Sequence, residues 1–110
     1  MNTIQELFED QIKDLHNAEK QLLKALPKMS KAAGTDSLRQ AFESHLTETE
    51  EHVQRIERIA EEAGFKVSGK KCKAMEGLIE EGEEVIKEEG NGPVKDMALV
   101  AAAQRVEHYE

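Results

Sequence analysis

Apolar residues recur every three or four positions through the first third of the chain, which is the period of an amphipathic helix. Thr3 and Glu6 have the spacing of a capping box, so we predict a first helix over about residues 3–33. Gly34 then predicts a left-handed helix cap. Pro27 lies inside this segment and removes one backbone donor, which predicts a kink there rather than a break.

A second helical pattern begins at Ser37 and ends before Gly64. Ser37 and Gln40 again have the spacing of a capping box. At about 1.5 Å per residue this helix is roughly 40 Å long, well beyond the usual length in a small domain. Only residues 34–36 separate the two long segments, so we expect an antiparallel helical hairpin.

The rest of the chain predicts two further helices after a connector over residues 65–71. The third covers about residues 73–89, and a turn then places Pro93 at the first position of the fourth. No stop signal follows, so we expect the fourth helix to continue to Glu110. The apolar stripe of the third helix consists of Met75, Leu78, Ile79, Val85 and Ile86. The apolar residues that mark the fourth helix are Val94, Met97, Ala98, Val100, Ala101 and Val106, and we expect Met97 to fill the core.

The composition agrees with helices rather than sheets, because 35% of the residues are charged and only 4% are aromatic. With 110 residues the chain is long enough for one core and too short for two substantial ones. We therefore expect an all-α antiparallel helical bundle with two long helices, a short third helix and a fourth helix. Residues 1–110 should form one domain, and the missing stop signal suggests that this domain is incomplete.

The formal net charge of −8 argues against a nucleic-acid partner, because such a partner requires a basic face. No stretch approaches the roughly 20 apolar residues of a membrane span, and the first ten residues do not have the pattern of a signal peptide. Cys72 is the single cysteine and cannot form an internal disulfide. We expect a cytoplasmic protein with neither a nucleic-acid nor a membrane partner.

Candidate metal ligands lie on the faces of the predicted helices that point to the core. Glu19 falls in the middle of the apolar stripe of the first helix, where an unpaired carboxylate would be costly. His45, Glu48 and His52 occur at i, i+3 and i+7 in the second helix, within about 60° of one another on its surface. A single histidine at a core position is usually structural, but three such side chains on one stripe favour a metal site.

Glu107 and Glu110 lie one turn apart in the fourth helix and can present two carboxylates to one ion. Helical bundles build paired-metal sites from inward-facing Glu and His, and Fe(II), Mn(II) and Zn(II) accept such mixed ligands. These residues therefore predict a di-metal iron site, with manganese or zinc as alternatives. The complete Glu-x-x-His pattern of di-iron bundles is missing, and the same acids could instead form buried salt bridges. No catalytic residue is assigned, because the sequence contains no motif of a hydrolase, kinase or dehydrogenase.

Five blocks follow one another along the chain: DLHNAEKQL (14–22), ALPKM (25–29), HLTET (45–49), CKAMEGL (72–78) and AAQRVEHYE (102–110). Together they resemble the YciF-type ferritin-like family of bacterial stress proteins over essentially the whole chain. The resemblance implies a ferritin-like bundle that binds metal, forms dimers and serves in the stress response. Carried over position by position, it implies metal-facing acids at Glu19, Glu48, Glu107 and Glu110. His45 and His52 are added by the helix geometry alone.

Members of that family continue through one more long helix, which implies that further ligands lie beyond Glu110. We therefore expect a homodimer or a higher homo-oligomer, with a site between chains. Two functions stay open at this point. The first is a metal protein whose iron reacts with peroxide or oxygen, and the second is a non-catalytic helical oligomer whose buried acids form salt bridges.

Overall fold

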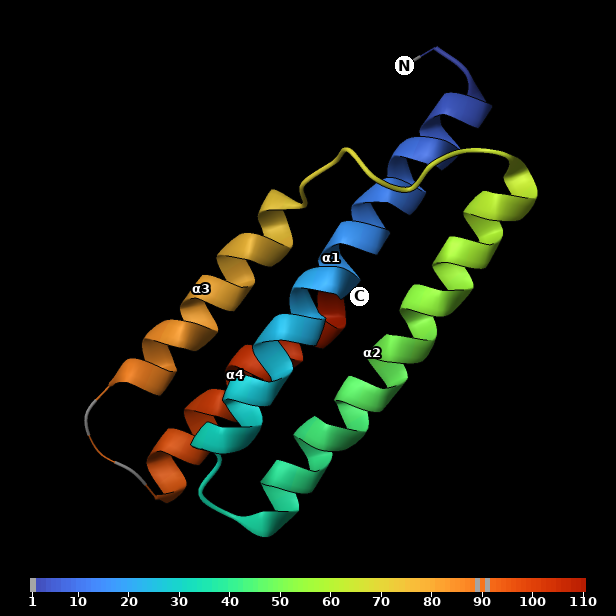
Figure 1. Ribbon diagram of the computed structural model, residues 1–110. Helices are drawn as coiled ribbons and strands as arrows, with labels where there is room; N and C mark the ends of the chain where they lie inside the picture. The colour runs from blue at the N-terminus through green and yellow to red at the C-terminus, as the bar shows by residue number, and fades with distance from the viewer. Residues whose placement is uncertain (1, 89, 91) are drawn as a thin grey trace.

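Four helices and no strand make up the part of the chain that the computed structural model describes, residues 2–88, 90 and 92–110. They are α1 (Ile4–Ala32), α2 (Asp36–Ala63), α3 (Lys73–Lys87) and α4 (Pro93–Tyr109). Consecutive helices within the pairs α1/α2 and α3/α4 run in opposite directions (Figure 1). The predicted all-α helical bundle is confirmed.

The start of α1 follows its capping prediction. Thr3 Oγ1 accepts a hydrogen bond from the Glu6 backbone N–H at 3.0 Å, and the Glu6 carboxylate accepts one from the Asn2 N–H at 2.9 Å. The helix then runs unbroken through Pro27. Thr3 thus satisfies one of the first four donors of α1, whereas the Glu6 carboxylate bonds the N–H of Asn2, outside the helix, rather than that of Thr3 as in a complete capping box.

The predicted left-handed cap at Gly34 is wrong. Ala33 caps α1 in an extended conformation, with φ −65° and ψ 135°, and Gly34 does not have a positive φ. The Gly34 N–H instead donates to Asp96 Oδ1 of α4 at 2.8 Å, and a Cβ at position 34 would lie only 3.1 Å from that carboxylate. Gly34 is therefore suited to a close approach between the α1–α2 connection and α4 rather than to a left-handed turn.

The cap of α2 lies two residues before the predicted one. Thr35 Oγ1 accepts from the Leu38 N–H at 3.1 Å, so Thr35 rather than Ser37 is the N-cap. The end of this helix agrees with the prediction, because Gly64 caps it in the left-handed region with φ 81°.

Replacing Thr35 with Ala is expected to lower the free energy of unfolding by about 1 kcal/mol, since it removes the hydrogen bond to Leu38. Ser37→Ala is the matched control, because Ser37 is exposed and already inside the helix, and it should change stability by less than about 0.5 kcal/mol. Urea denaturation of both variants measures the difference. Equal losses would contradict the assignment of Thr35 as the cap.

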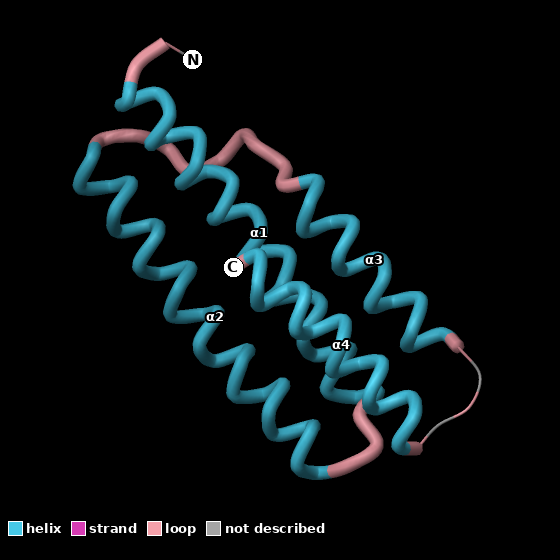
Figure 2. Tube along the Cα trace, turned by 180° about the vertical axis from the view of Figure 1, so that it is seen from behind, coloured by secondary structure: helices cyan, strands magenta, loops and turns pink. Residues whose placement is uncertain are grey.

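A crossover segment over residues 64–72 leads from the end of α2 across α1 to the start of α3, so α2 and α3 pack on opposite sides of α1 (Figures 1 and 2). Phe65 packs edge-to-face on Phe8 with ring centroids 6.1 Å apart. Lys70 Nζ lies 2.8 Å from both carboxylate oxygens of Asp10. These contacts fix the crossover on the N-terminal half of α1.

The core combines side chains of all four helices and the residues that flank them. Its fully buried large members include Leu22, Leu26, Met75 and Leu99. The core prediction for α3 agrees, since Leu78, Ile79, Val85 and Ile86 pack against this cluster together with buried Met75. The predicted end of α3 at Glu89 lies outside the described residues; the helix ends at Lys87.

The prediction that Met97 of α4 fills the core is wrong. The buried residues are Leu99, Ala102, Ala103 and Val106, whereas Met97 is 73% exposed and Val94 is 80% exposed. Apolar residues occur around most of this helix, so its sequence period does not select one face. Which face is buried is decided by packing against α3.

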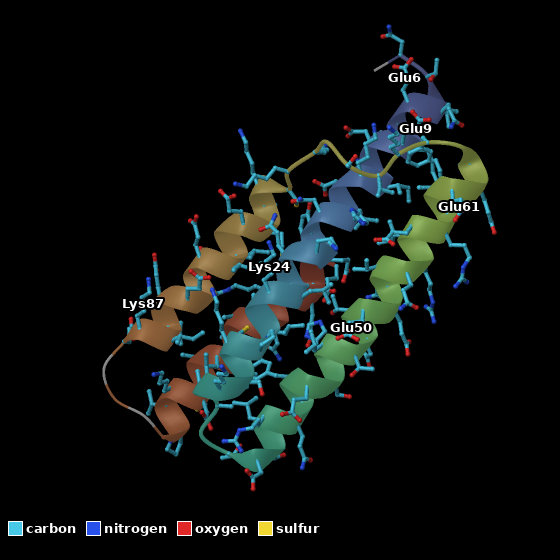
Figure 3. All side chains as sticks on the ribbon, in the orientation of Figure 1. Glu6, Glu9, Lys24, Glu50, Glu61 and Lys87 are labelled. Atoms are coloured by element: carbon cyan, nitrogen blue, oxygen red, sulfur yellow. The ribbon has the colours of Figure 1, made fainter. Side chains whose placement is uncertain are left out.

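The outer surface of the bundle is strongly charged. Side chains such as Lys24, Glu50, Glu61 and Lys87 are exposed and extend away from the helices (Figure 3). Among the described residues, none of the helices is both long and apolar enough to cross a membrane.

Candidate metal centre

Three helices bring Glu19, His52 and Glu110 together. Glu19 comes from α1, His52 from α2, and Glu110 immediately follows α4. One ligand atom of each residue lies within 4.8 Å of the ligand atoms of the other two. His52 Nδ1 is 3.5 Å from Glu19 Oε2 and 4.0 Å from Glu110 Oε2. The group faces inward between the three helices, where a single cation could contact all three side chains.

Glu19 owes its position to the helical period of α1. It lies beside Ala18 and one turn before Leu22, both of which are buried, and is itself only 3% exposed. Among the described residues, no N–H or O–H donor bonds to the buried Oε2 of Glu19 or the buried Oε2 of Glu110, so only a proton held between these two carboxylates could hydrogen-bond them. Unpaired buried carboxylate oxygens are costly, so this arrangement calls for a proton or a cation at the same place.

His45 extends the group toward the edge of the bundle. Its Nε2 lies 2.7 Å from Glu110 Oε1, and its Nδ1 lies 3.8 Å from Glu107 Oε1. Nδ1 of His45 is buried, and within the described part of the chain it has no hydrogen-bond partner. Glu110 therefore uses one carboxylate oxygen toward His45 and directs the other toward Glu19 and His52.

The charges of these groups depend on one another. Burial, followed by the hydrogen bond that protonated Glu19 makes to Glu110 and by the negative charge of Glu110, raises the pKa of Glu19 to about 8. Burial also acts to raise the pKa of Glu110, but hydrogen bonds with His45 and Glu19 and the charges of His45 and His52 outweigh it and lower that pKa. The same bond with Glu110 raises the pKa of His45 against the opposing effect of burial. Near neutral pH, Glu19 is protonated and Glu110 is ionised.

The metal-free chain is expected to become less stable as the pH rises from about 5 to about 8. In this interval folded Glu19 keeps its proton while unfolded Glu19, with an ordinary pKa near 4.5, has lost it, so rising pH favours unfolding. His45 acts in the same direction, because its raised pKa is that of the folded state. Thermal unfolding in the presence of a chelator measures the effect. Glu19→Gln should flatten the profile, and a wild-type melting temperature that rises over this interval would contradict it.

The remaining predicted ligands lie outside the central group. Glu107 is at its edge, near His45, with its side chain 59% exposed. Glu48 is exposed on α2, and its negative charge contributes only the last of the effects that raise the pKa of His45. The structure thus brings Glu19, His52 and Glu110 together and joins His45 to them through Glu110, with Glu107 beside His45 and Glu48 in solvent.

Sequence reasoning did not single out the polar residues next to this centre. Tyr109 donates a hydrogen bond from its hydroxyl to Asp14 Oδ2 at 2.6 Å, and Asn17 Oδ1 accepts from the backbone N–H of Cys72 at 2.7 Å. A signal was present, because Asp14, Asn17 and Gln21 occur at i, i+3 and i+7 on α1 and so share one helix face.

Known proteins match the chain over nearly its whole length. Protein YciF of Escherichia coli (strain K12) is 48% identical over 111 residues, which is 100% of this chain and 67% of that protein. The crystal structure of the E. coli stress protein YciF matches with a TM-score of 0.94 and 47% identity, covering 99% of this chain and 69% of that one.

A second solved structure also matches the fold of the chain. It is YcfI from Rhodopseudomonas palustris, described as a candidate structural protein, which matches with a TM-score of 0.92 and 41% identity over 98% of this chain and 69% of its own. The family described as a domain of unknown function, DUF892, matches residues 3–110. The resemblance to YciF-type proteins is confirmed, and the chain belongs to the DUF892 family.

Proposed function

We propose that this chain binds a divalent transition-metal ion among Glu19, His52 and Glu110 and serves in the bacterial stress response. One observation carries the proposal: two buried carboxylate oxygens, one on α1 and one at the end of α4, face the same imidazole and receive no hydrogen bond from an N–H or hydroxyl of the described residues. A bound cation would compensate both oxygens at once. The stress role comes from the E. coli relative, which is named a stress protein.

The ligand types favour particular metals. Carboxylate oxygens together with imidazole nitrogen suit Fe(II), Mn(II) and Zn(II), whereas Mg²⁺ and Ca²⁺ prefer oxygen ligands alone. We propose iron, which when bound supplies one-electron redox chemistry toward peroxide or oxygen. His45 and Glu107 could help to hold a second ion, because Glu110 directs one oxygen toward His45 and the other toward His52.

The residues of the chain have distinct tasks in this proposal. Glu19 must release its proton before it binds a cation, so binding should strengthen as the pH approaches its pKa of about 8. Glu110 is already ionised and supplies the attracting charge. Glu19 is buried, which restricts water on its side of the group. His52 is partly exposed, so an ion could enter from solvent beside it.

Elemental analysis after anaerobic loading with Fe(II) tests this function. We expect one or two ions per wild-type chain and loss of metal in His52→Ala. His16→Ala is the matched control, because His16 also pairs with a glutamate across α1 and α2, at 3.1 Å from Glu57, but lies outside the group. Metal at background level in the wild type, or equal metal in both variants, would contradict the proposal.

A second candidate function is a non-catalytic helical oligomer, such as a homodimer. The observation that favours it is a shallow groove between α2 and α4, lined by Leu38, Ala41 and Val100, with exposed Met97 at its edge. Exposed apolar patches of this kind often form interfaces between proteins. Sedimentation velocity should then show more than one chain per particle for the wild type and a shift to single chains for Met97→Glu. Single chains in the wild type would exclude this candidate.

A further inference from the structure

Tyr109 is the one tyrosine of the chain, and its hydroxyl joins three elements beside the candidate metal centre. It donates to Asp14 Oδ2 of α1 at 2.6 Å and accepts from the thiol of Cys72, the N-cap of α3, at 3.2 Å. Cys72 is fixed in turn by its backbone, which bonds to Asn17 at 2.7 Å and to Gln21 at 3.0 Å. One hydroxyl thus connects the last turn of α4 with α1 and with the start of α3.

The bond to Asp14 is the stronger of the two that the hydroxyl makes. Its acceptor is a carboxylate, and 2.6 Å is within the range of charge-assisted O–H···O⁻ bonds. The phenol is the donor of this bond, and the Asp14 carboxylate is its acceptor.

Glu110 follows Tyr109 directly in the chain, and its two carboxylate oxygens are directed to two different histidines. Its Oε1 lies 2.7 Å from His45 Nε2, while its Oε2 is directed toward His52 at 4.0 Å. Its backbone N–H donates to the Val106 carbonyl at 3.0 Å, so the carboxylate moves with the last turn of α4. A binding site keeps its productive geometry only while each ligand stays within about 0.5 Å of its place.

Asp14, the acceptor of the Tyr109 hydrogen bond, lies on α1, which also provides Glu19. Asp14 and Glu19 are five residues apart on α1, about 7.5 Å along its axis. A hydrogen bond from Tyr109 to Asp14 therefore fixes the distance between the last turn of α4 and the part of α1 that bears Glu19. The neighbouring Cys72 bond restrains the same ring from the side of α3.

We propose that Tyr109 is a positioning residue of the metal centre, whose hydroxyl, bonded to Asp14, holds Glu110 at the place where it meets Glu19 and His52. The inference rests on the proposed function, because it assigns a role in binding metal at that centre.

Co(II), as the probe metal, tests the inference in the whole chain. Tyr109→Phe keeps the ring and removes the hydroxyl, so Co(II) affinity should fall about tenfold or more, the range found for groups that support metal ligands. The visible absorption spectrum of bound Co(II) should change as well, because Glu110 shifts relative to the ion. Asp14→Ala should reproduce both effects, while Asp14→Asn keeps an oxygen acceptor and should retain most of the affinity.

Thr35→Ala is the control for a general loss of stability. It weakens the cap at the far end of α2, ten residues before His45, and should leave Co(II) affinity and the spectrum unchanged. Tyr109 with a purely structural role would behave in the same way. Wild-type affinity and an unaltered spectrum in Tyr109→Phe would therefore overturn the inference.

Failure of the proposed function gives a different result, because the wild type itself would then bind no Co(II). In that case the metal-free chain decides the role of Tyr109, from the melting temperatures of Tyr109→Phe, Glu110→Gln and the double variant in a chelator. Positioning predicts non-additive shifts, because the contact between Glu110 and His45 depends on Tyr109. Additive shifts would overturn it.

Discussion

Glu110→Gln is expected to lower metal affinity by more than about 100-fold, beyond the range found when only a supporting group is removed. Glu110 approaches both His45 and His52, and because hydrogen bonding to His45 lowers its pKa, we expect Glu110 to be the ionised carboxylate of the pair with Glu19. Glutamine has nearly the same shape but no charge and only one acceptor oxygen. Isothermal titration with Mn(II) measures the change directly.

Glu48→Gln is the matched control for this substitution. It changes the net charge by the same amount, on a residue that the sequence also suggests as a ligand, but Glu48 is exposed on α2. We expect its metal affinity to stay within about a factor of three of the wild type, which is the size of a screened charge effect near a surface. Comparable losses in the two variants would mean that the centre is organised differently from the structure.

Leu22→Ala is expected to lower the free energy of unfolding by about 2–5 kcal/mol. Leu22 of α1 is fully buried among the other core residues. Truncation of its side chain leaves a cavity in a closely packed interior. Ile4→Ala is the control, because Ile4 is 85% exposed and should contribute less than about 0.5 kcal/mol. Equilibrium denaturation measures both variants. A loss below 1 kcal/mol for Leu22→Ala would indicate a loosely packed core.

Local signals predicted the helices well. The capping pair at Thr3 and Glu6, the glycine at Gly64 and the proline at Pro93 each act within one turn, so sequence alone is enough to place them. The cap at Thr35 was misplaced by two residues, because Thr35 and Ser37 are both chemically competent and the choice depends on where the connection from α1 ends.

Long-range packing was less predictable. Whether Met97 or Leu99 faces the core is decided by how α4 lies against α3, and apolar residues on several sides of α4 hide that choice. Gly34 is similar, since its role depends on Asp96, which is distant in sequence.

In the candidate centre, too, local spacing and long-range packing differ in how far the sequence predicts them. Helical spacing placed His45, Glu48 and His52 on one face of α2. His45 and His52 differ by only about 20° around the helix and both approach Glu110, whereas Glu48 lies about 60° from His45 and is exposed. The bond between Tyr109 and Asp14 spans 95 residues of sequence and has no local signature. Packing of the helices, rather than any single motif, brings these residues together.

A crystal structure of the Mn(II)-loaded chain, with an anomalous difference map, tests the central claim most directly. The account predicts a peak between Glu19, His52 and Glu110, with a carboxylate oxygen of each glutamate and a ring nitrogen of His52 as ligands. No anomalous peak at this position in Mn(II)-saturated crystals, or a peak only on the exposed acidic surface of α3, would contradict it.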